Sequence, residues 1–297
     1  FGVEGNRLPA SAEPRMPNGS GGVSFVARKD FMSRIFGNEH PYGTNVNLID
    51  YENLSVDDVS NFYNENYNLG NCRILVSGKV SQTNVKTLNS FFGKEKIESN
   101  ASREKEVSIN ANTTSNLFIE KENALQSAIR IGRILPNKLH KDYFGLQILN
   151  TVLGGYFGSR LMNNIREDKG YTYGIGSGII SLKNAGYFFI STEVGSKVTS
   201  KALTETYKEI ELIRTTEIGI DELELVKNYM LGQLLKSCDG PFSMASLFEN
   251  VHEFGLDYNF YNNYIKTIQE ITPRALLDLG AKYFNKSDLK EIVVGQL

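Results

Sequence analysis

The spacing of apolar and polar positions predicts a helix and then a strand in the first third of the chain. Between residues 53 and 67, apolar side chains recur at helical spacing behind Ser55, and Asp58 follows three residues later, as in a capping box. Residues 72–78, which read CRILVSG, have the short apolar run of a buried strand. We therefore expect a capped helix that leads directly into a strand.

A longer series of elements is expected in the second half. Ile129 and Ile131 alternate with Arg130 and Gly132, which predicts a strand over residues 128–135. The other expected elements are helices at 142–155, 159–169, 198–213, 223–234 and 272–284, paired strands at 171–180 and 186–194, and a closing strand at 291–297. Pro273 suits the first turn of the last of these helices.

Two polar stretches indicate boundaries. Residues 1–27 are rich in Gly, Pro, Ser and Asn and have no hydrophobic period, which predicts an irregular or linker segment. Residues 94–116 are polar and charged, as expected of a surface linker. A second domain is therefore expected to begin near residue 112.

The two ends of the chain share a pattern. Residues 54–78 match residues 271–295 without a gap, so that Ser55 aligns with Thr272 and Gly78 with Gly295. Chance remains an open explanation, because any helix followed by a buried strand gives similar apolar matches. If the match is a duplication and the second copy begins near residue 112, the same offset places the start of the first copy before residue 1. The first copy would then lack its N-terminal half.

Composition excludes several classes of partner. The chain has 297 residues, is 40% hydrophobic, and carries 32 Lys and Arg against 34 Asp and Glu, a net charge of −2. This balance lacks the basic excess of proteins that bind nucleic acid or anionic membranes. No run approaches the roughly 18 apolar residues of a membrane span. We expect a soluble protein whose compartment, cytoplasmic or periplasmic, stays undecided, and two unrelated thiols at Cys72 and Cys238.

Several motifs in register resemble a known family. The stretch LGGYFGSRLMNNIREDKGYTYGIGS at 153–177, followed by AGYFFISTEVG at 185–195, resembles the second domain of the pitrilysin and insulinase family of zinc peptidases. This inverzincin family includes the mitochondrial processing peptidases and bacterial relatives. HPYG at 40–43, with the following helix and ILVSG, resembles the closing half of the preceding domain. The resemblance implies an α+β fold of two similar domains, each a mostly antiparallel sheet packed with helices.

The resemblance also implies how the chain divides. It covers about residues 28–297, with the closing half of a first domain at 28–105 and a complete second domain at 112–297. The first domain would lack its N-terminal half, which agrees with the repeat.

The zinc motif of that family, H-x-x-E-H, is absent from the sequence. It places two His side chains on one helical face and a Glu beside the metal-bound water. The nearest imitation, FGNEH at 36–40, has Phe36 in place of the first ligand, and Pro41 pushes His40 away from helical geometry. We therefore expect no metal or cofactor in this chain, and zinc in a missing N-terminal half or in a zinc-bearing partner subunit of a heterodimer.

Arg166 and Tyr173 have two interpretations. From the residues alone, Arg166 is a basic residue in the last turn of a helix that stops at Gly170, and Tyr173 is a half-buried strand aromatic. The resemblance implies instead that Arg166 and Tyr173 face the zinc site of the first half across a cavity. There Arg offers N–H donors to a peptide substrate, and Tyr offers an O–H to an oxyanion.

The expected function follows from the second interpretation. We expect Arg166 and Tyr173, with Gly154 and Gly155, to form a substrate-binding site for extended peptide. The alternative is a purely structural subunit, like the core subunits of respiratory complexes that share the fold without proteolysis.

Overall fold

The computed structural model describes residues 22–67, 70, 72–93, 109 and 116–297. Most of the chain after residue 116 builds one five-stranded sheet, whose strands are β1 (Asn116–Glu120), β2 (Gln126–Leu135), β3 (Ile175–Ser181), β4 (Gly186–Gly195) and β5 (Lys290–Gly295). Their order across the sheet is β1-β5-β2-β4-β3. The β1–β5 pair is parallel and the other three pairs are antiparallel. The expected α+β class with a mostly antiparallel sheet is confirmed.

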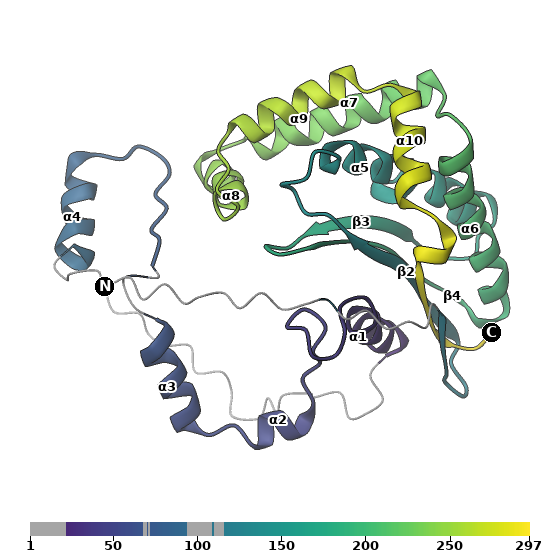
Figure 1. The fold of residues 1–297 in the computed structure, drawn as a ribbon, viewed down its shortest axis with the longest axis horizontal. Coiled ribbons are helices and arrows are strands. Elements are labelled where there is room, and N and C mark those ends of the chain that lie inside the picture. The colour runs from purple at the N-terminus through teal and green to yellow at the C-terminus, as the bar shows by residue number, and fades with distance from the viewer. Residues whose placement is uncertain (1–21, 68–69, 71, 94–108, 110–115) are drawn as a thin grey trace.

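Helices cover one face of this sheet, as Figure 1 shows. They are α5 (Tyr143–Asn150), α6 (Thr199–Thr215), α7 (Ile220–Ser237), α9 (Asn259–Glu270) and α10 (Pro273–Tyr283). Helix α8 (Pro241–His252) follows α7 and lies beside the end of the sheet. Two π-helices, η2 (Thr151–Gly155) and η3 (Met162–Asp168), follow α5, and short 3₁₀ turns lie at η4 (Ser196–Val198) and η5 (Lys286–Asp288). Ile129, Ile131, Phe188 and Val293 pack beneath these helices in the larger hydrophobic core. In the strand pattern read at 128–135, Ile129 and Ile131 therefore face this core.

Helix α1 (Val23–Phe36) packs on the opposite face of the sheet (Figure 1). Its Phe31 and Phe36 join Ile292 and Val294 in a second core. Gly132 permits this approach, because a Cβ at that position would lie 2.7 Å from Cζ of Phe31. Since Val293 enters the first core, β5 is buried on both faces. Residues 23–27, expected to be irregular, are therefore helical, and residues 1–21 lie outside the described part.

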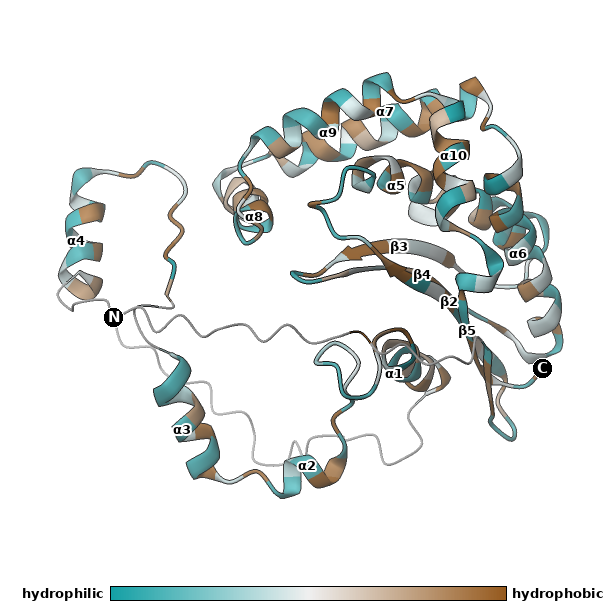
Figure 2. Ribbon diagram, in the orientation of Figure 1, coloured by the Kyte–Doolittle hydropathy of each residue, from teal (hydrophilic) through white to brown (hydrophobic). Residues whose placement is uncertain are grey.

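The described residues between 48 and 93 form helices but have little core of their own. These helices are α2 (Leu48–Glu52), α3 (Val56–Asn66) and α4 (Gln82–Phe92). The large apolar side chains of this segment that are exposed include Val59, Phe62 and Val76. Figure 2 shows hydrophobic positions along α3 and α4, which lie apart from the covered sheet. Residues 72–78, expected to be a strand, pair with no other strand in the described part of the chain, so the expected strand is not formed there.

The repeat extends from sequence to geometry. Helices α3 and α10 begin and end at aligned residues. Ser55 caps α3 by accepting a hydrogen bond from the Asp58 amide, and Thr272 caps α10 through the amide of Ala275. Gly78 and Gly295 both have positive φ, at 120° and 142°. A shared helix, cap and glycine conformation favour duplication over a chance match.

Candidate functional site

Arg166 and Tyr173 flank the turn from η3 into β3. Gly170 has φ of 63°, and its amide donates to the carbonyl of Arg166 at 3.1 Å. This is the left-handed helix stop expected from the sequence. The chain then passes through Tyr173 and enters β3 at Ile175.

The side chain of Arg166 is held beside an aromatic ring. Its guanidinium carbon lies 4.6 Å from the ring centre of Phe157, within the range of a cation–π contact. One nitrogen, Nη1, lies 3.4 Å from Oε1 of the adjacent Glu167. About a third of the Arg166 side chain stays exposed, so it can still offer N–H donors to a molecule outside the chain.

Tyr173 is 93% exposed. Among the described residues, no hydrogen bond or ring contact involves it. The interpretation as a half-buried strand aromatic is therefore wrong. Burial does not explain this tyrosine, and its side chain is accessible to solvent.

Gly154 and Gly155 occupy different environments within η2. A Cβ at Gly154 would lie 2.5 Å from Oγ and 2.8 Å from the amide nitrogen of Ser177 on β3. Gly154 therefore lets the π-helix pack directly on the strand. Gly155 is exposed, with the nearest neighbour of a Cβ at 3.2 Å on Asn150. Packing accounts for Gly154, while the substrate role expected for both glycines stays a prediction.

A bidentate ion pair fixes this region to the helical layer. Nε and Nη2 of Arg160, just before η3, donate to the two carboxylate oxygens of Glu222 on α7 at 2.8 and 2.7 Å. These hydrogen bonds outweigh burial and raise the pKa of Arg160. Sequence reasoning missed this pair, because neither residue carries a motif that points to the other.

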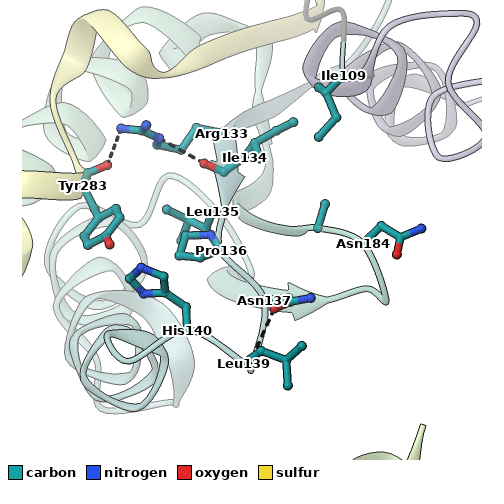
Figure 3. Close-up of a pocket in the computed structure, with 11 residues that line it drawn as sticks. Ile109, Arg133, Ile134, Leu135, Pro136, Asn137, Leu139, His140, Asn184 and Tyr283 are labelled. Atoms are coloured by element: carbon teal, nitrogen blue, oxygen red, sulfur yellow. Dashed lines mark hydrogen bonds between the residues drawn. The ribbon is translucent and has the colours of Figure 1, made fainter. Parts of the chain in front are cut away.

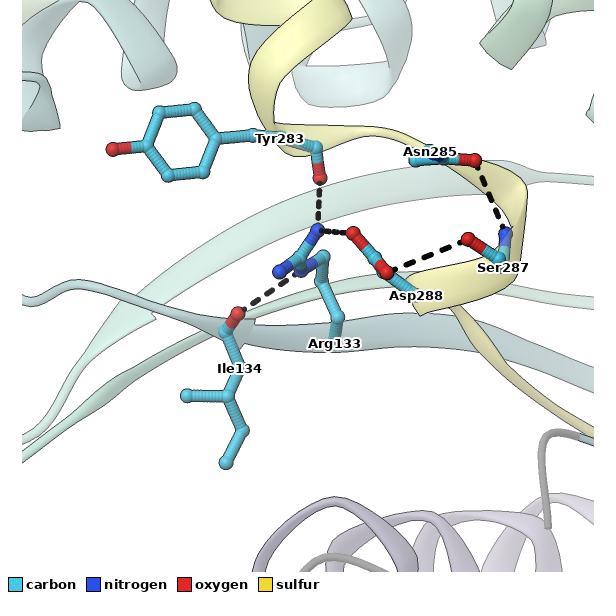
Figure 4. Close-up of polar contacts among 6 residues, drawn as sticks. All are labelled: Arg133, Ile134, Tyr283, Asn285, Ser287 and Asp288. Carbon is cyan, nitrogen blue, oxygen red and sulfur yellow. Dashed lines mark hydrogen bonds and ion pairs between the residues drawn. The ribbon is translucent and has the colours of Figure 1, made fainter. Parts of the chain in front are cut away.

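A cavity of about 530 Å³ lies where β2 meets the end of α10, and several of its polar groups are already engaged (Figure 3). Nη1 of Arg133 donates to the carbonyl of Tyr283 at 2.8 Å and to Asp288 at 2.7 Å, and Nε donates to the carbonyl of Ile134 (Figure 4). Nδ1 of His140 accepts a hydrogen bond from the amide of Asp142. The contacts of Arg133 join β2 to the α10–β5 connection, so its role is structural.

The described residues do not fit a zinc ion. Helix α1 ends at Phe36, and His40 lies buried in the following turn, where its Nδ1 accepts from the amide of Tyr42. Within the described ranges, no three His, Cys, Asp or Glu side chains are placed to hold a metal. No step of metal-assisted hydrolysis is therefore assigned to these residues. In the same part of the chain, no helix has the length and apolar character to cross a membrane.

Comparison with known families gives a match over more than half of the chain. The peptidase M16 inactive domain matches residues 53–230, a range that contains Arg166 and Tyr173. The chain belongs to this M16 family. The resemblance to the zinc peptidases read from the sequence is thereby confirmed.

Relatives of this M16 chain include one protein named as a protease and one named as inactive. "Uncharacterized zinc protease YmxG" of Bacillus subtilis is 28% identical over 191 residues, which are 64% of this chain and 46% of the relative. "Probable inactive metalloprotease YmfF" of the same organism is 20% identical over 251 residues, 82% and 57% of the two chains. The chain thus spans about half the length of these curated relatives.

Solved structures support the fold. The crystal structure of a peptidase M16 inactive domain from Pseudomonas fluorescens matches with a TM-score of 0.77 at 19% identity, covering 92% of this chain and 66% of that one. At this identity the similarity concerns the fold alone.

Proposed function

We propose that this M16 chain is a non-catalytic peptidase unit that binds extended peptide and orients it with Arg166 and Tyr173 toward a zinc site carried elsewhere. The observation that carries the proposal is the state of these two side chains. Arg166 is partly exposed and held by Phe157, and Tyr173 is almost fully exposed on the same turn. Packing in a hydrophobic core therefore does not explain the position of either side chain.

The chemistry of the pair suits a peptide bond under attack. A guanidinium has five fixed N–H donors that can bind a substrate carbonyl or carboxylate. A phenolic O–H can donate to an oxyanion, which develops as the carbonyl is attacked. Because Glu222 anchors Arg160 beside η3, Arg166 is presented from a fixed element.

The uncovered segment between residues 48 and 93 supports a partner. Its residues 73–78 align with β5, which takes β1 as a parallel neighbour and β2 as an antiparallel one. On α3, Val59 and Phe62 align with Leu276 and Leu279 of α10, which pack in the larger core. A second sheet of the same kind would cover both sets of side chains. We propose that a zinc-bearing half, in a separate subunit or in a longer chain, supplies this sheet.

The alternative function is a structural or interaction unit without a role in proteolysis. The name of the relative YmfF, a probable inactive metalloprotease, favours it. The uncovered apolar surface is compatible with both functions, because each requires a partner.

Reconstituted turnover separates the two functions. The chain alone, supplied with zinc, should not cleave an unstructured peptide. With a family member's zinc-bearing half present, Arg166→Ala and Tyr173→Phe should each lower turnover by about 10²-fold, as expected for loss of an oxyanion donor, with an unchanged melting temperature. Arg274→Ala, an exposed arginine on α10, is the matched control. Normal turnover by both site variants would identify the structural function instead.

A further inference from the structure

A second cavity lies between α1 and the face of the sheet that α1 covers. Its volume is about 550 Å³, and six of the residues that line it are aromatic. Three cationic residues also line it, Arg28 and Lys29 from α1 and Arg130 from β2, whereas no Asp or Glu does. A cavity lined mainly by apolar and aromatic side chains, with a few polar or charged groups, is the usual form of a ligand site.

The two arginines have no hydrogen-bond or ion-pair partner within the described part of the chain. Neither Arg28 nor Arg130 takes part in a hydrogen bond or ion pair there, although each guanidinium lies about 6 Å from an aromatic ring centre, at 5.9 and 5.8 Å. Lys29 differs, since its Nζ donates to Oδ1 of Asn47 at 3.0 Å. Arg133, on the same strand as Arg130, makes three hydrogen bonds. Arg28 and Arg130 therefore keep their donors available.

Both arginines act on the same hydroxyl. Burial raises the pKa of Tyr187, and the charges of Arg130 and Arg28 oppose that rise. Burial also lowers the pKa of Arg130, and the charge of Arg28 lowers it further. The charges of Tyr187 and Glu193 oppose this lowering but do not outweigh it. The two like charges near one phenol are thus only partly balanced, an arrangement that a bound anion would stabilise.

Three of the six aromatic side chains that line the cavity pack against one another. Phe31 is 1% exposed and fixed in the core beneath α1, and the ring of Tyr187 packs 6.3 Å from it, centre to centre. Phe189 packs against Tyr187 from the same strand. The apolar part of the site therefore exists before any ligand arrives, which lowers the entropic cost of binding.

We propose that this cavity binds a peptide carboxylate, with Arg28 and Arg130 pairing with its oxygens and the aromatic wall packing against the neighbouring apolar side chain. The carboxylate can come from a chain terminus or from an acidic side chain, since both present the same two oxygens to a guanidinium fork. The choice of a peptide rests on the proposed function. The site is separate from Arg166 and Tyr173, so it would hold a part of the peptide away from the cleaved bond.

Calorimetry on the isolated chain tests this site. The probes are acetyl-Ala-Ala-Phe-Leu as the free acid, the same peptide as its amide, and the amide with Glu in place of Leu. The free acid, the Glu peptide, or both should bind at least about 10-fold more tightly than the neutral amide, as expected for charge-assisted hydrogen bonds. Tighter binding of the free acid identifies a chain terminus as the source of the carboxylate, and tighter binding of the Glu peptide identifies an acidic side chain. Equal binding of all three probes would overturn the proposal.

Substitutions locate the bound peptide. R28Q and R130Q should each weaken binding about 10-fold, while R274Q, with the same change of charge, should not. R130Q should not lower the melting temperature, because it removes a half-buried charge that makes no hydrogen bond or ion pair among the described residues. Binding that survives R130Q, or that is lost in R166A, would place the peptide elsewhere and overturn this site.

Loss of turnover in R166A alone concerns the proposed function and leaves this site intact. Inorganic phosphate that binds as tightly as the peptides would reduce the cavity to a simple anion site and overturn peptide recognition.

Discussion

The guanidinium of Arg166 lies over the ring of Phe157, a side chain that is itself 65% exposed. An aromatic ring this accessible contributes little to a core, and its contact with Arg166 is the clearest task visible for it. The pair therefore presents an arginine in one orientation at the surface.

Removing the ring should affect function more than stability. Phe157→Ala should change the free energy of unfolding by less than about 0.5 kcal/mol, as for other exposed positions. In the reconstituted enzyme it should raise KM several-fold, because a cation–π contact of about 0.5–1 kcal/mol no longer orients Arg166. Phe157→Tyr should retain wild-type kinetics, and Phe242→Ala, another exposed ring, is the control. An unchanged KM would remove the orienting role.

The adjacent glycines of η2 should respond differently to a methyl group. Gly154→Ala should destabilise the chain by about 1–3 kcal/mol, since the new Cβ would meet Ser177 on β3. Gly155→Ala should cost much less, because its Cβ would have more room. Chemical denaturation of both variants measures the difference. Equal losses would mean that η2 does not rest on β3 as described.

The aligned strands offer a matched pair of substitutions. Val293 is 2% exposed in β5, whereas Val76, its counterpart in the repeat, is 49% exposed. Val293→Asp should prevent folding of the sheet, because a charge would enter the core. Val76→Asp should leave the melting temperature unchanged and abolish association with the zinc-bearing half, as measured by sedimentation. Unimpaired association would show that residues 73–78 do not pair with the partner.

Asp142 should make stability depend on pH in acid. Burial disfavours its charged form, but hydrogen bonds from Lys282 and Tyr283 outweigh burial and hold the pKa of Asp142 below 3.8. The stabilisation of the folded chain by the Asp142 carboxylate is thus complete at neutral pH. It is lost as pH falls through this lowered pKa. Asp142→Asn should lower the melting temperature at pH 7. The difference in melting temperature between the variant and the wild type should become smaller below about pH 4. Asp278→Asn, at an exposed site, should show no such narrowing.

Local signals in the sequence predicted the elements that depend on local chemistry. Ser55 and Asp58 predicted the start of α3, and Pro273 predicted the start of α10, because helix caps act within one turn. The alternation around Ile129 and Ile131 located β2 for a similar reason. The candidate pair Arg166 and Tyr173 came from a motif, and the structure adds the exposure of Tyr173 and the role of Phe157.

Features that depend on distant partners could not be read in the same way. Residues 72–78 have the composition of a strand, yet a strand forms only beside another strand, and the described residues supply none. The packing of α1 on the sheet depends on Gly132 leaving room for Phe31, a contact between residues far apart in the chain. The cavity of Arg28 and Arg130 was missed because it exists only after that packing.

Strand β1 joins the described sheet through β5 alone, and β5 comes after every helix of this part of the chain. During synthesis, Phe118 leaves the ribosome long before Val293, with which it pairs. Contacts so distant in sequence close slowly, because a long loop must be ordered before they form. Nascent β1 would thus wait as an unpaired apolar strand, and the interval before β5 emerges is when this protein would most need a chaperone.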